Sequence, residues 1–279
     1  MENRICLLAD RGVLRMEGAE TQGFLQRLIT NSVLDFGPGE SRFSALLTPQ
    51  GKLLFDFFVV PLPEGAEAGF LIDCVRDQSA ALAQRLDLHK MRAKIAITDQ
   101  SDSLGVAAVL AGDAPALPGA IVYRDMRAGL MGQRIIGARQ DLLKVSNAGA
   151  AEYEGRRIAE GVPKGGVDFV YGDAFVQDAN LDWLNGVDFK KGCYVGQEVV
   201  ARVHHRNSAR KRIVKFRFEG EPPAEGAEIA AAGAALGQVG STSGSEGLAM
   251  VRLDRLDDAR AAGATLTAGA TPIAVLAPG

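Results

Sequence analysis

Residues 213–218 read Ile213-Val214-Lys215-Phe216-Arg217-Phe218, in which apolar and basic residues alternate. Successive side chains of a β-strand point to opposite faces, so this period of two predicts a strand with one buried face. Pro222-Pro223 interrupts the pattern, and three further strand-like segments follow between glycine-rich turns, at 228–230, 248–253 and 271–276. Short strands with such turns are typical of a small β-barrel or sandwich. We therefore predict an almost entirely β domain that begins near Ser208, with the boundary at 207–212.

The residues before this domain combine helical and strand patterns. Phe24, Leu25, Leu28 and Ile29 have the spacing of an amphipathic helix. Strands at 43–47 and 53–60, joined by the turn Thr48-Pro49-Gln50-Gly51, predict a hairpin. The remaining predicted strands are 69–75, 94–98, 105–110, 121–123 and 133–136, and the remaining predicted helices are 79–89 and 150–160. This mixture predicts an α+β fold.

Composition excludes several classes of protein. The 279 residues suffice for about two domains. The 31 Lys+Arg against 34 Asp+Glu give a net charge of −3, which argues against a duplex-binding surface over the whole molecule. The longest apolar run, 53–60, is far short of the ~20 residues that span a bilayer, and the first residues lack the apolar core of a signal peptide. We therefore expect a soluble, cytoplasmic protein without direct nucleic-acid or membrane partners.

The three cysteines, Cys6, Cys74 and Cys193, are odd in number and far apart, which does not indicate a disulfide framework. Without a Cys-x-x-Cys pair, a zinc ribbon or an iron–sulfur cluster held by this chain alone is disfavoured. The adjacent His204 and His205 lack the further ligands that a metal needs. No metal site is predicted.

The segment richest in reactive and charged residues is Phe189-Lys190-Lys191-Gly192-Cys193-Tyr194-Val195-Gly196-Gln197-Glu198-Val199-Val200-Ala201-Arg202. The two glycines around Cys193 permit a tight turn and close approach of a ligand. Cations on both sides favour the thiolate form of this cysteine. Cys193 is therefore either a reactive thiol or a small buried residue in a glycine turn. The pattern after Gly196 allows a helix or a strand.

Several charged and aromatic residues leave two interpretations open. Asp56 lies inside an apolar strand, so it is either paired structurally or held for a ligand. A charged group made of Arg124, Asp125, Arg127 and Arg134 is either a set of surface ion pairs or faces an anion. Tyr153 and Trp183 are either stacking platforms or core residues.

The stretch Lys191-Gly192-Cys193-Tyr194-Val195-Gly196-Gln197-Glu198 resembles the K-G-C-Y-x-G-Q-E signature of the YgfZ-type folate-binding proteins, relatives of the glycine-cleavage T-protein (aminomethyltransferase). Other similarities extend along nearly the whole chain. They comprise the opening segment 18–31, the hairpin Leu47-Thr48-Pro49-Gln50-Gly51-Lys52, the segment Asp125-Met126-Arg127 with Met where the family usually has Pro, and the helix end Arg157-Ile158-Ala159-Glu160-Gly161-Val162-Pro163.

This resemblance implies α+β modules around a central channel and a C-terminal all-β barrel domain. It implies a discontinuous folate-binding domain of residues 1–45 and 145–207, a second α+β domain of residues 46–144, and the barrel at 208–279. The implied ligand is tetrahydrofolate or a one-carbon-substituted derivative. The implied role is in making or repairing iron–sulfur proteins, including enzymes that modify tRNA, with these client proteins as partners.

Comparison with the T-protein separates two functions. The position of its catalytic aspartate is retained as Asp56. Its folate-binding glutamate and arginine look like Arg134 and Tyr153 here, so an acidic partner for the pterin is missing. In the YgfZ type, an aromatic at the Tyr153 position is similar to a folate-contacting tryptophan, and a second such tryptophan appears here as Arg11. The T-protein also lacks the Cys193 signature, which favours the YgfZ-type role over aminomethyl transfer.

The resemblance thus implies a set of site residues. Cys193 and Asp56 are the candidates for chemistry, with Cys193 as the thiol-reactive residue and Asp56 as a contact to the pterin nitrogens. The candidate binding residues are Tyr153 for stacking, Arg127 and Arg134 for folate carboxylates, Arg11 at the second tryptophan position, and Lys191, Tyr194, Gln197 and Glu198 around the cysteine loop. The alternatives are a folate-dependent aminomethyltransferase or other one-carbon transferase, and an interaction module without a ligand.

Overall fold

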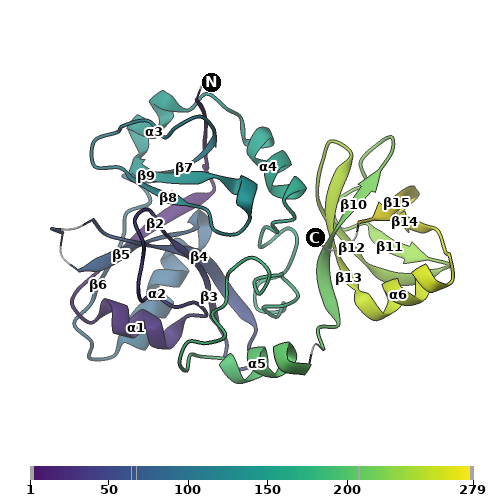
Figure 1. The fold of residues 1–279 in the computed structure, drawn as a ribbon, viewed down its shortest axis with the longest axis horizontal. Helices are drawn as coiled ribbons and strands as arrows, with labels where there is room; N and C mark the ends of the chain where they lie inside the picture. Colours follow the sequence, from purple (N-terminus) through teal and green to yellow (C-terminus); the bar gives the residue numbers. More distant parts are fainter. Residues whose placement is uncertain (1–2, 64, 67, 207, 277–279) are drawn as a thin grey trace. The chain divides into compact units, whose positions relative to one another are not determined.

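Two antiparallel sheets and one closed barrel contain the strands of the computed structural model, which describes residues 3–63, 65–66, 68–206 and 208–276 (Figure 1). The chain forms two units, Met1–Leu47 with Leu54–Tyr153 and Leu184–Val195, and Thr48–Leu53 with Glu154–Trp183 and Gly196–Gly279. The three-domain division stays a prediction, and its residues 1–2 and 277–279, like Asn207 in the predicted boundary, lie outside the described residues. No helix in the described ranges is long and apolar enough to cross a membrane.

A five-stranded sheet in the first unit has the order β3-β4-β5-β2-β6. Its strands are β2 (Arg11–Glu17), β3 (Arg42–Leu47), β4 (Leu53–Pro61), β5 (Gly69–Val75) and β6 (Ala96–Asp99). The helices α1 (Thr21–Leu28) and α2 (Ser79–Lys90) supply Leu25 and Leu82 to a core that also contains Phe57 and Ile72 of the sheet. Because side chains alternate along each strand, Phe58 and Asp73, which are register partners, lie on the opposite face.

A four-stranded sheet of the same unit packs against that opposite face. Its order is β1-β7-β9-β8, with β1 (Arg4–Leu7), β7 (Leu104–Ala111), β8 (Ile121–Arg124) and β9 (Gln133–Ala138). The helix α3 (Arg139–Val145) covers its outer face through Leu142, which packs with Ile135. Tyr123 and Arg134 are register partners on the inner face, and the Tyr123 ring lies 6.1 Å from that of Phe58. Polar side chains of both sheets therefore meet between the two layers.

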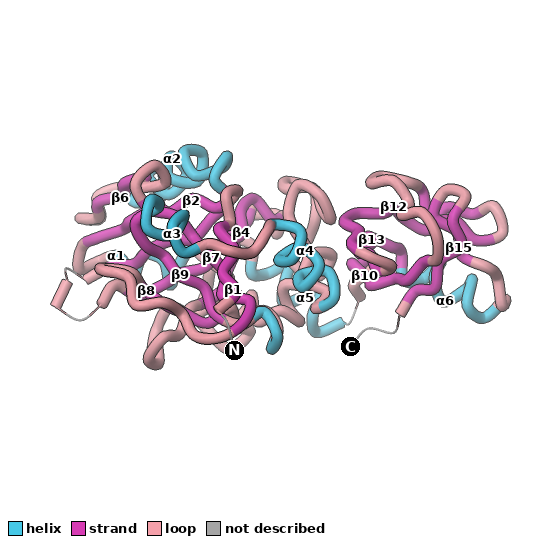
Figure 2. Tube along the Cα trace, turned by 90° about the horizontal axis from the view of Figure 1, so that it is seen from above, coloured by secondary structure: helices cyan, strands magenta, loops and turns pink. Residues whose placement is uncertain are grey.

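The second unit contains the barrel, closed in the order β10-β13-β12-β11-β14-β15. Its strands are β10 (Lys211–Phe218), β11 (Glu228–Ala231), β12 (Ala234–Ser243), β13 (Glu246–Arg252), β14 (Leu266–Ala268) and β15 (Thr271–Val275), drawn in magenta in Figure 2. Phe216 and Phe218 point into its core, as the period of two predicts. The predicted β-barrel is confirmed, with one helix, α6 (Leu253–Ala261), whose Leu256 packs on that core.

Most predicted elements occur within a few residues of their predicted positions, including the helix α4 (Ala150–Ala159). Leu253, predicted to end a strand, instead begins α6. The residues after Gly196 form a helix, α5 (Gln197–Arg206). Strands β2, β12 and β14 and helix α3 were not predicted. Strand β2 has buried residues on both faces, such as Val13 and Leu14, so it shows no alternation of polar and apolar residues.

Candidate functional site

The loop that carries Cys193 is held to the first unit by backbone and side-chain hydrogen bonds. Asp188 Oδ1 accepts the backbone N–H groups of Lys190 at 2.8 Å and of Lys191 at 3.2 Å, which shapes the turn before the cysteine. Thr30 Oγ1 donates to the carbonyl of Gly186 at 2.7 Å. Cys193 itself is exposed and unpaired. The loop is thus fixed at its base while its thiol faces solvent.

Lys191 is the strongest anchor of this loop. Its side chain is buried, and Nζ donates to the carbonyl oxygens of Ile29 at 2.7 Å and Asn31 at 2.6 Å. Burial lowers the pKa of Lys191 to about 8. The Tyr194 ring lies 5.4 Å from the ammonium, and burial raises the pKa of Tyr194 to about 12. Lys191 and Tyr194, which flank Gly192 and Cys193 in the sequence, therefore anchor the base of the loop.

The other two cysteines lie in strands and are buried, Cys6 in β1 and Cys74 in β5. Burial raises the pKa of Cys74 to about 12, so this thiol stays protonated at neutral pH. Of the three cysteines, only Cys193 is exposed to a partner molecule or to an alkylating reagent.

A second cluster of predicted site residues lies between the two sheets of the first unit, centred on Arg134 of β9. Its guanidinium is only 2% exposed and donates to three different acceptors. Nη1 donates to Asp73 Oδ2 at 2.6 Å, Nε to Asp125 Oδ2 at 3.0 Å, and Nη2 to the Tyr153 hydroxyl at 2.6 Å. Each guanidinium nitrogen of Arg134 thus has an acceptor within the protein.

Arg127 completes the same cluster. Its Nε and Nη2 contact the two carboxylate oxygens of Asp125 at 2.9 and 2.7 Å, a bidentate pair, and Nη2 also reaches the Tyr153 hydroxyl at 3.2 Å. The guanidinium lies 4.9 Å from the ring centre of Phe58. Such a fork-to-fork pair is among the stronger hydrogen-bonding arrangements in proteins. The interpretation as surface ion pairs is therefore wrong for Arg127 and Asp125, because both are buried.

Arg11 and Tyr123 bind the same carboxylate, that of Asp73. Arg11 Nε contacts Oδ1 at 2.6 Å, and the Tyr123 hydroxyl donates to Oδ2 at 2.7 Å. Burial alone would raise the pKa of Asp73, but Arg11 and Arg134 outweigh it and hold the pKa below its ordinary value. Asp125 behaves likewise, since the two arginines bonded to it overcome its burial. Both carboxylates are therefore charged at neutral pH.

Asp56 lies on the same face of β4 as Phe58, and it is largely buried. Its charge acts on Arg11. Burial lowers the pKa of Arg11, but Asp73 and, more weakly, Asp56 raise it above its ordinary value. Asp56 thus lies within electrostatic reach of the cluster, at the inner face of the sheet.

The structure therefore brings Arg11, Arg127, Arg134 and Tyr153 together and places Lys191 and Tyr194 beside Cys193. Gln197 and Glu198 instead begin α5 in the second unit, where Glu198 pairs with Arg202 at 2.8 Å. Asp73 and Tyr123 were missed by the sequence analysis. The signal that singled out Asp56, an aspartate inside an apolar strand, also applies to Asp73 in the sequence Phe70-Leu71-Ile72-Asp73-Cys74.

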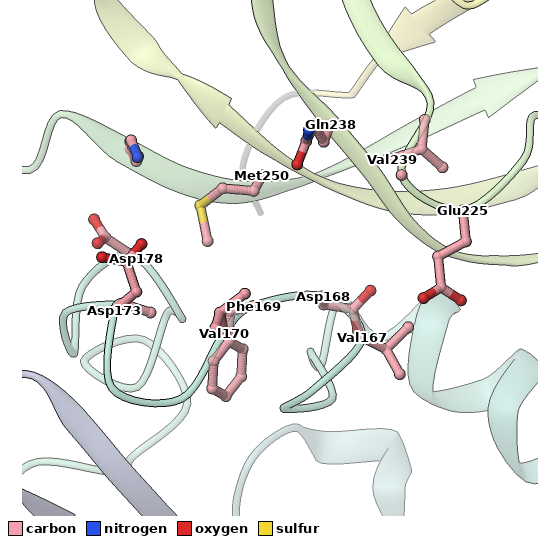
Figure 3. Close-up of a pocket in the computed structure, with 13 residues that line it drawn as sticks. Val167, Asp168, Phe169, Val170, Asp173, Asp178, Glu225, Gln238, Val239 and Met250 are labelled. Atoms are coloured by element: carbon pink, nitrogen blue, oxygen red, sulfur yellow. The ribbon is translucent and has the colours of Figure 1, made fainter.

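The second unit has its own cavity, of about 320 Å³, between the segment 167–178 and strands β12 and β13 (Figure 3). Phe169, Val170 and Met250 face one another across its middle, and Asp173 and Asp178 lie together at one end. Trp183, a predicted stacking platform, is half-exposed in this unit, with the Arg212 guanidinium 3.7 Å from its ring centre.

No group of three or more metal-ligating side chains is found within the part of the chain that the structure describes. The chemically distinctive features are thus an exposed thiol on an anchored loop and a buried network of ion pairs. The first can react with a partner, whereas the second has its donors directed at internal acceptors.

The fold, α+β sheets with a C-terminal β-barrel, is similar to that of a solved aminomethyltransferase. The aminomethyltransferase T of the glycine cleavage system from Bartonella henselae matches with a TM-score of 0.75 and 16% sequence identity, over 99% of this chain and 85% of that one. The family described as CAF17, C-terminal beta-barrel domain, matches residues 210–279.

Curated relatives define the family more closely. The iron–sulfur cluster assembly factor IBA57 homolog of Coccidioides immitis, named as mitochondrial, is 32% identical, with 90% of this chain and 72% of that protein covered. Mitochondrial IBA57 of Mus musculus is 30% identical, over 89% of this chain and 77% of that protein. Mitochondrial IBA57 of Homo sapiens has the same identity and the same coverage of both chains. The chain belongs to the IBA57 family.

Proposed function

We propose that this protein is a tetrahydrofolate-binding accessory factor in the assembly or repair of iron–sulfur proteins, with Cys193 as its reactive thiol. The observation that carries the proposal is the exposed Cys193 on a loop anchored by buried Lys191. The names of the relatives support the iron–sulfur role. The YgfZ-type signature supports the finer proposal that the clients include tRNA-modifying iron–sulfur enzymes.

In this proposal Lys191 is a positioning residue. Its two hydrogen bonds to the carbonyls of Ile29 and Asn31 fix the base of the loop, which limits the conformations that Cys193 can adopt. A fixed nucleophile presents its sulfur to a partner in a defined direction at lower entropic cost. The Tyr194 ring lies 5.4 Å from the same ammonium.

Folate binding rests on the family resemblance and the fold. Arg134 and Arg127 do not fit the role of folate-carboxylate partners as they stand, because their guanidinium groups already contact Asp73, Asp125 and Tyr153. Asp56, at the inner face of β4, fits the role of a contact to pterin nitrogens better. We therefore keep the assignments of Arg127, Arg134 and Asp56 as predictions and derive no reaction step through folate.

The decisive experiment replaces Cys193 with Ser in cells that lack the native gene. We expect the activity of iron–sulfur enzymes to fall to the level of the deletion strain, with the melting temperature of the purified variant unchanged. Cys6→Ala is the matched control and should restore activity, because Cys6 is buried. Full activity of the Cys193 variant would refute the thiol role. Calorimetric titration with tetrahydrofolate tests the folate part separately.

Aminomethyl or other one-carbon transfer is the second candidate, because Asp56 occupies the position of the T-protein's catalytic aspartate. An assay of methylene transfer to and from tetrahydrofolate separates the two, since an accessory factor should show no turnover. The cytoplasm remains our proposed compartment, although the relatives are named as mitochondrial. Fractionation of the source cells tests it.

A further inference from the structure

A cavity of about 250 Å³ lies in the second unit, beside the C-terminal end of α5 and the start of β10. Its size is slightly below the usual range of roughly 300–1,000 Å³ for small-molecule pockets. The walls that matter for its chemistry are Phe175, Gln177, Asp178, Val203, Arg210 and Lys211. None of these residues belongs to the Cys193 loop or to the buried ion-pair network.

The wall contains an unsatisfied acceptor. Gln177 is 2% exposed, and its Nε2 donates to the carbonyl of Val200 at 3.0 Å, which fixes the orientation of the amide. Its Oε1 is buried and accepts no hydrogen bond from any described residue. Buried polar side-chain atoms are nearly always hydrogen-bonded, so this oxygen calls for a donor from a ligand or from water.

The wall also carries charged groups of both signs that form no ion pair among the described residues. Arg210 and Lys211 are the two cations among them, and both are exposed. Asp178 Oδ2 accepts the backbone N–H of Phe175 at 2.9 Å, but no described cation pairs with this carboxylate. Burial raises the pKa of Asp178, and the hydrogen bond from Phe175 and the charges of Lys211 and Lys52 oppose this rise. Asp178 also lies beside Asp173 at one end of the larger cavity in Figure 3.

The remaining charges on this wall neutralise one another. Lys52 Nζ lies 3.4 Å from the carboxylate of Asp173 and 3.8 Å from the ring centre of Phe175. Two sets of groups therefore remain available to a ligand. The first is the carboxylate of Asp178 with the amide oxygen of Gln177, and the second is the two cations Arg210 and Lys211. A ligand with a single charge would satisfy one set and repel the other.

We propose that this cavity binds a free α-amino acid with an apolar side chain. The ammonium pairs with Asp178 and donates to Gln177 Oε1, which supplies the missing cation and the missing donor. The carboxylate pairs with Arg210 and Lys211. The apolar side chain packs on Phe175 and Val203, whose surfaces line the same cavity.

The test uses the full chain, with L-leucine as the probe in isothermal titration calorimetry. The matched analogues are 4-methylpentanoate, which lacks the ammonium, and 3-methylbutylamine, which lacks the carboxylate. Leucine should bind, and each analogue should bind at least roughly tenfold more weakly. The reason is that 4-methylpentanoate leaves Asp178 without a cation, and 3-methylbutylamine leaves Arg210 and Lys211 without an anion. Absence of leucine binding at millimolar concentration, or equal binding of either analogue, overturns the proposal.

Variants locate the site. Asp178→Asn and Arg210→Gln should each weaken leucine binding by roughly tenfold or more. Glu225→Gln is the control, because Glu225 lines the larger cavity but not this one. Arg210 is exposed, so its variant should fold even if the Asp178 variant does not. Unchanged affinity in the Arg210 variant refutes the assignment. Neither folate nor iron–sulfur activity enters this test, so its outcome is independent of the proposed function.

Discussion

Replacement of Arg134 by Met separates a structural from a ligand-binding role for the buried network. The change keeps an unbranched, apolar stem and removes three hydrogen bonds, to Asp73, Asp125 and Tyr153. Loss of one partner of a buried ion pair typically costs ~3–5 kcal/mol. Because Asp73 keeps Arg11 and Asp125 keeps its second arginine, we expect the lower end, about 3 kcal/mol.

The assays are urea unfolding and thermal unfolding, both followed by circular dichroism, with Lys144→Met as the control. Lys144 pairs with Asp141 on the surface of the same unit, and such exposed pairs contribute ~0–1 kcal/mol. For a unit of 150–250 residues, ~3 kcal/mol corresponds to a fall of about 6–12 °C in melting temperature. Arg134→Met should reach this range, and Lys144→Met should stay near the wild type.

The pH dependence of the difference has a defined sign. The pKa values of Asp73 and Asp125 are lowered in the folded protein. The charged carboxylates therefore stabilise the folded state fully at pH values above ~3.9, the ordinary pKa of aspartate, and this contribution is lost as the pH falls through the folded-state pKa values. In Arg134→Met these pKa values rise, so the gap between variant and wild type should shrink in acid. A variant as stable as the control that no longer binds tetrahydrofolate would refute the structural role.

Three further predictions concern single residues. Iodoacetamide at neutral pH should label Cys193 well before Cys6 and Cys74, because only Cys193 is exposed; mass spectrometry of the peptides that shows another order would contradict this. Between pH 8 and about 10.4, the free energy of unfolding of the wild type should rise relative to that of Lys191→Met. The reason is that the folded-state pKa of Lys191, about 8, lies below the ordinary lysine value, so the unfolded state binds the proton more tightly. A pH-independent difference between the two proteins in urea unfolding would contradict this prediction. Asp56→Ala should weaken tetrahydrofolate binding in calorimetry with little change in melting temperature, and the reverse result would make Asp56 a structural ion-pair member.

The exposure of the cysteine loop could be anticipated only in part. The glycines around Cys193 indicated space beside the sulfur, and the structure leaves this residue exposed. The anchoring of Lys191 by the carbonyls of Ile29 and Asn31, about 160 residues earlier in the chain, left no local pattern. A lysine between a turn and a glycine looks like a surface residue until the segment that covers it is known.

The sequence by itself determined an almost entirely β C-terminal domain, because a period of two assigns alternate side chains of 213–218 to the core wherever the neighbouring strands lie. It likewise determined most helices and strands of the first unit, since these depend on neighbouring residues. Only the tertiary structure decided that Arg134, Asp73 and Tyr153 meet in one buried network. Periodicity assigns a side chain to a face of its own strand, but which sheet packs on that face depends on contacts between residues far apart in the chain.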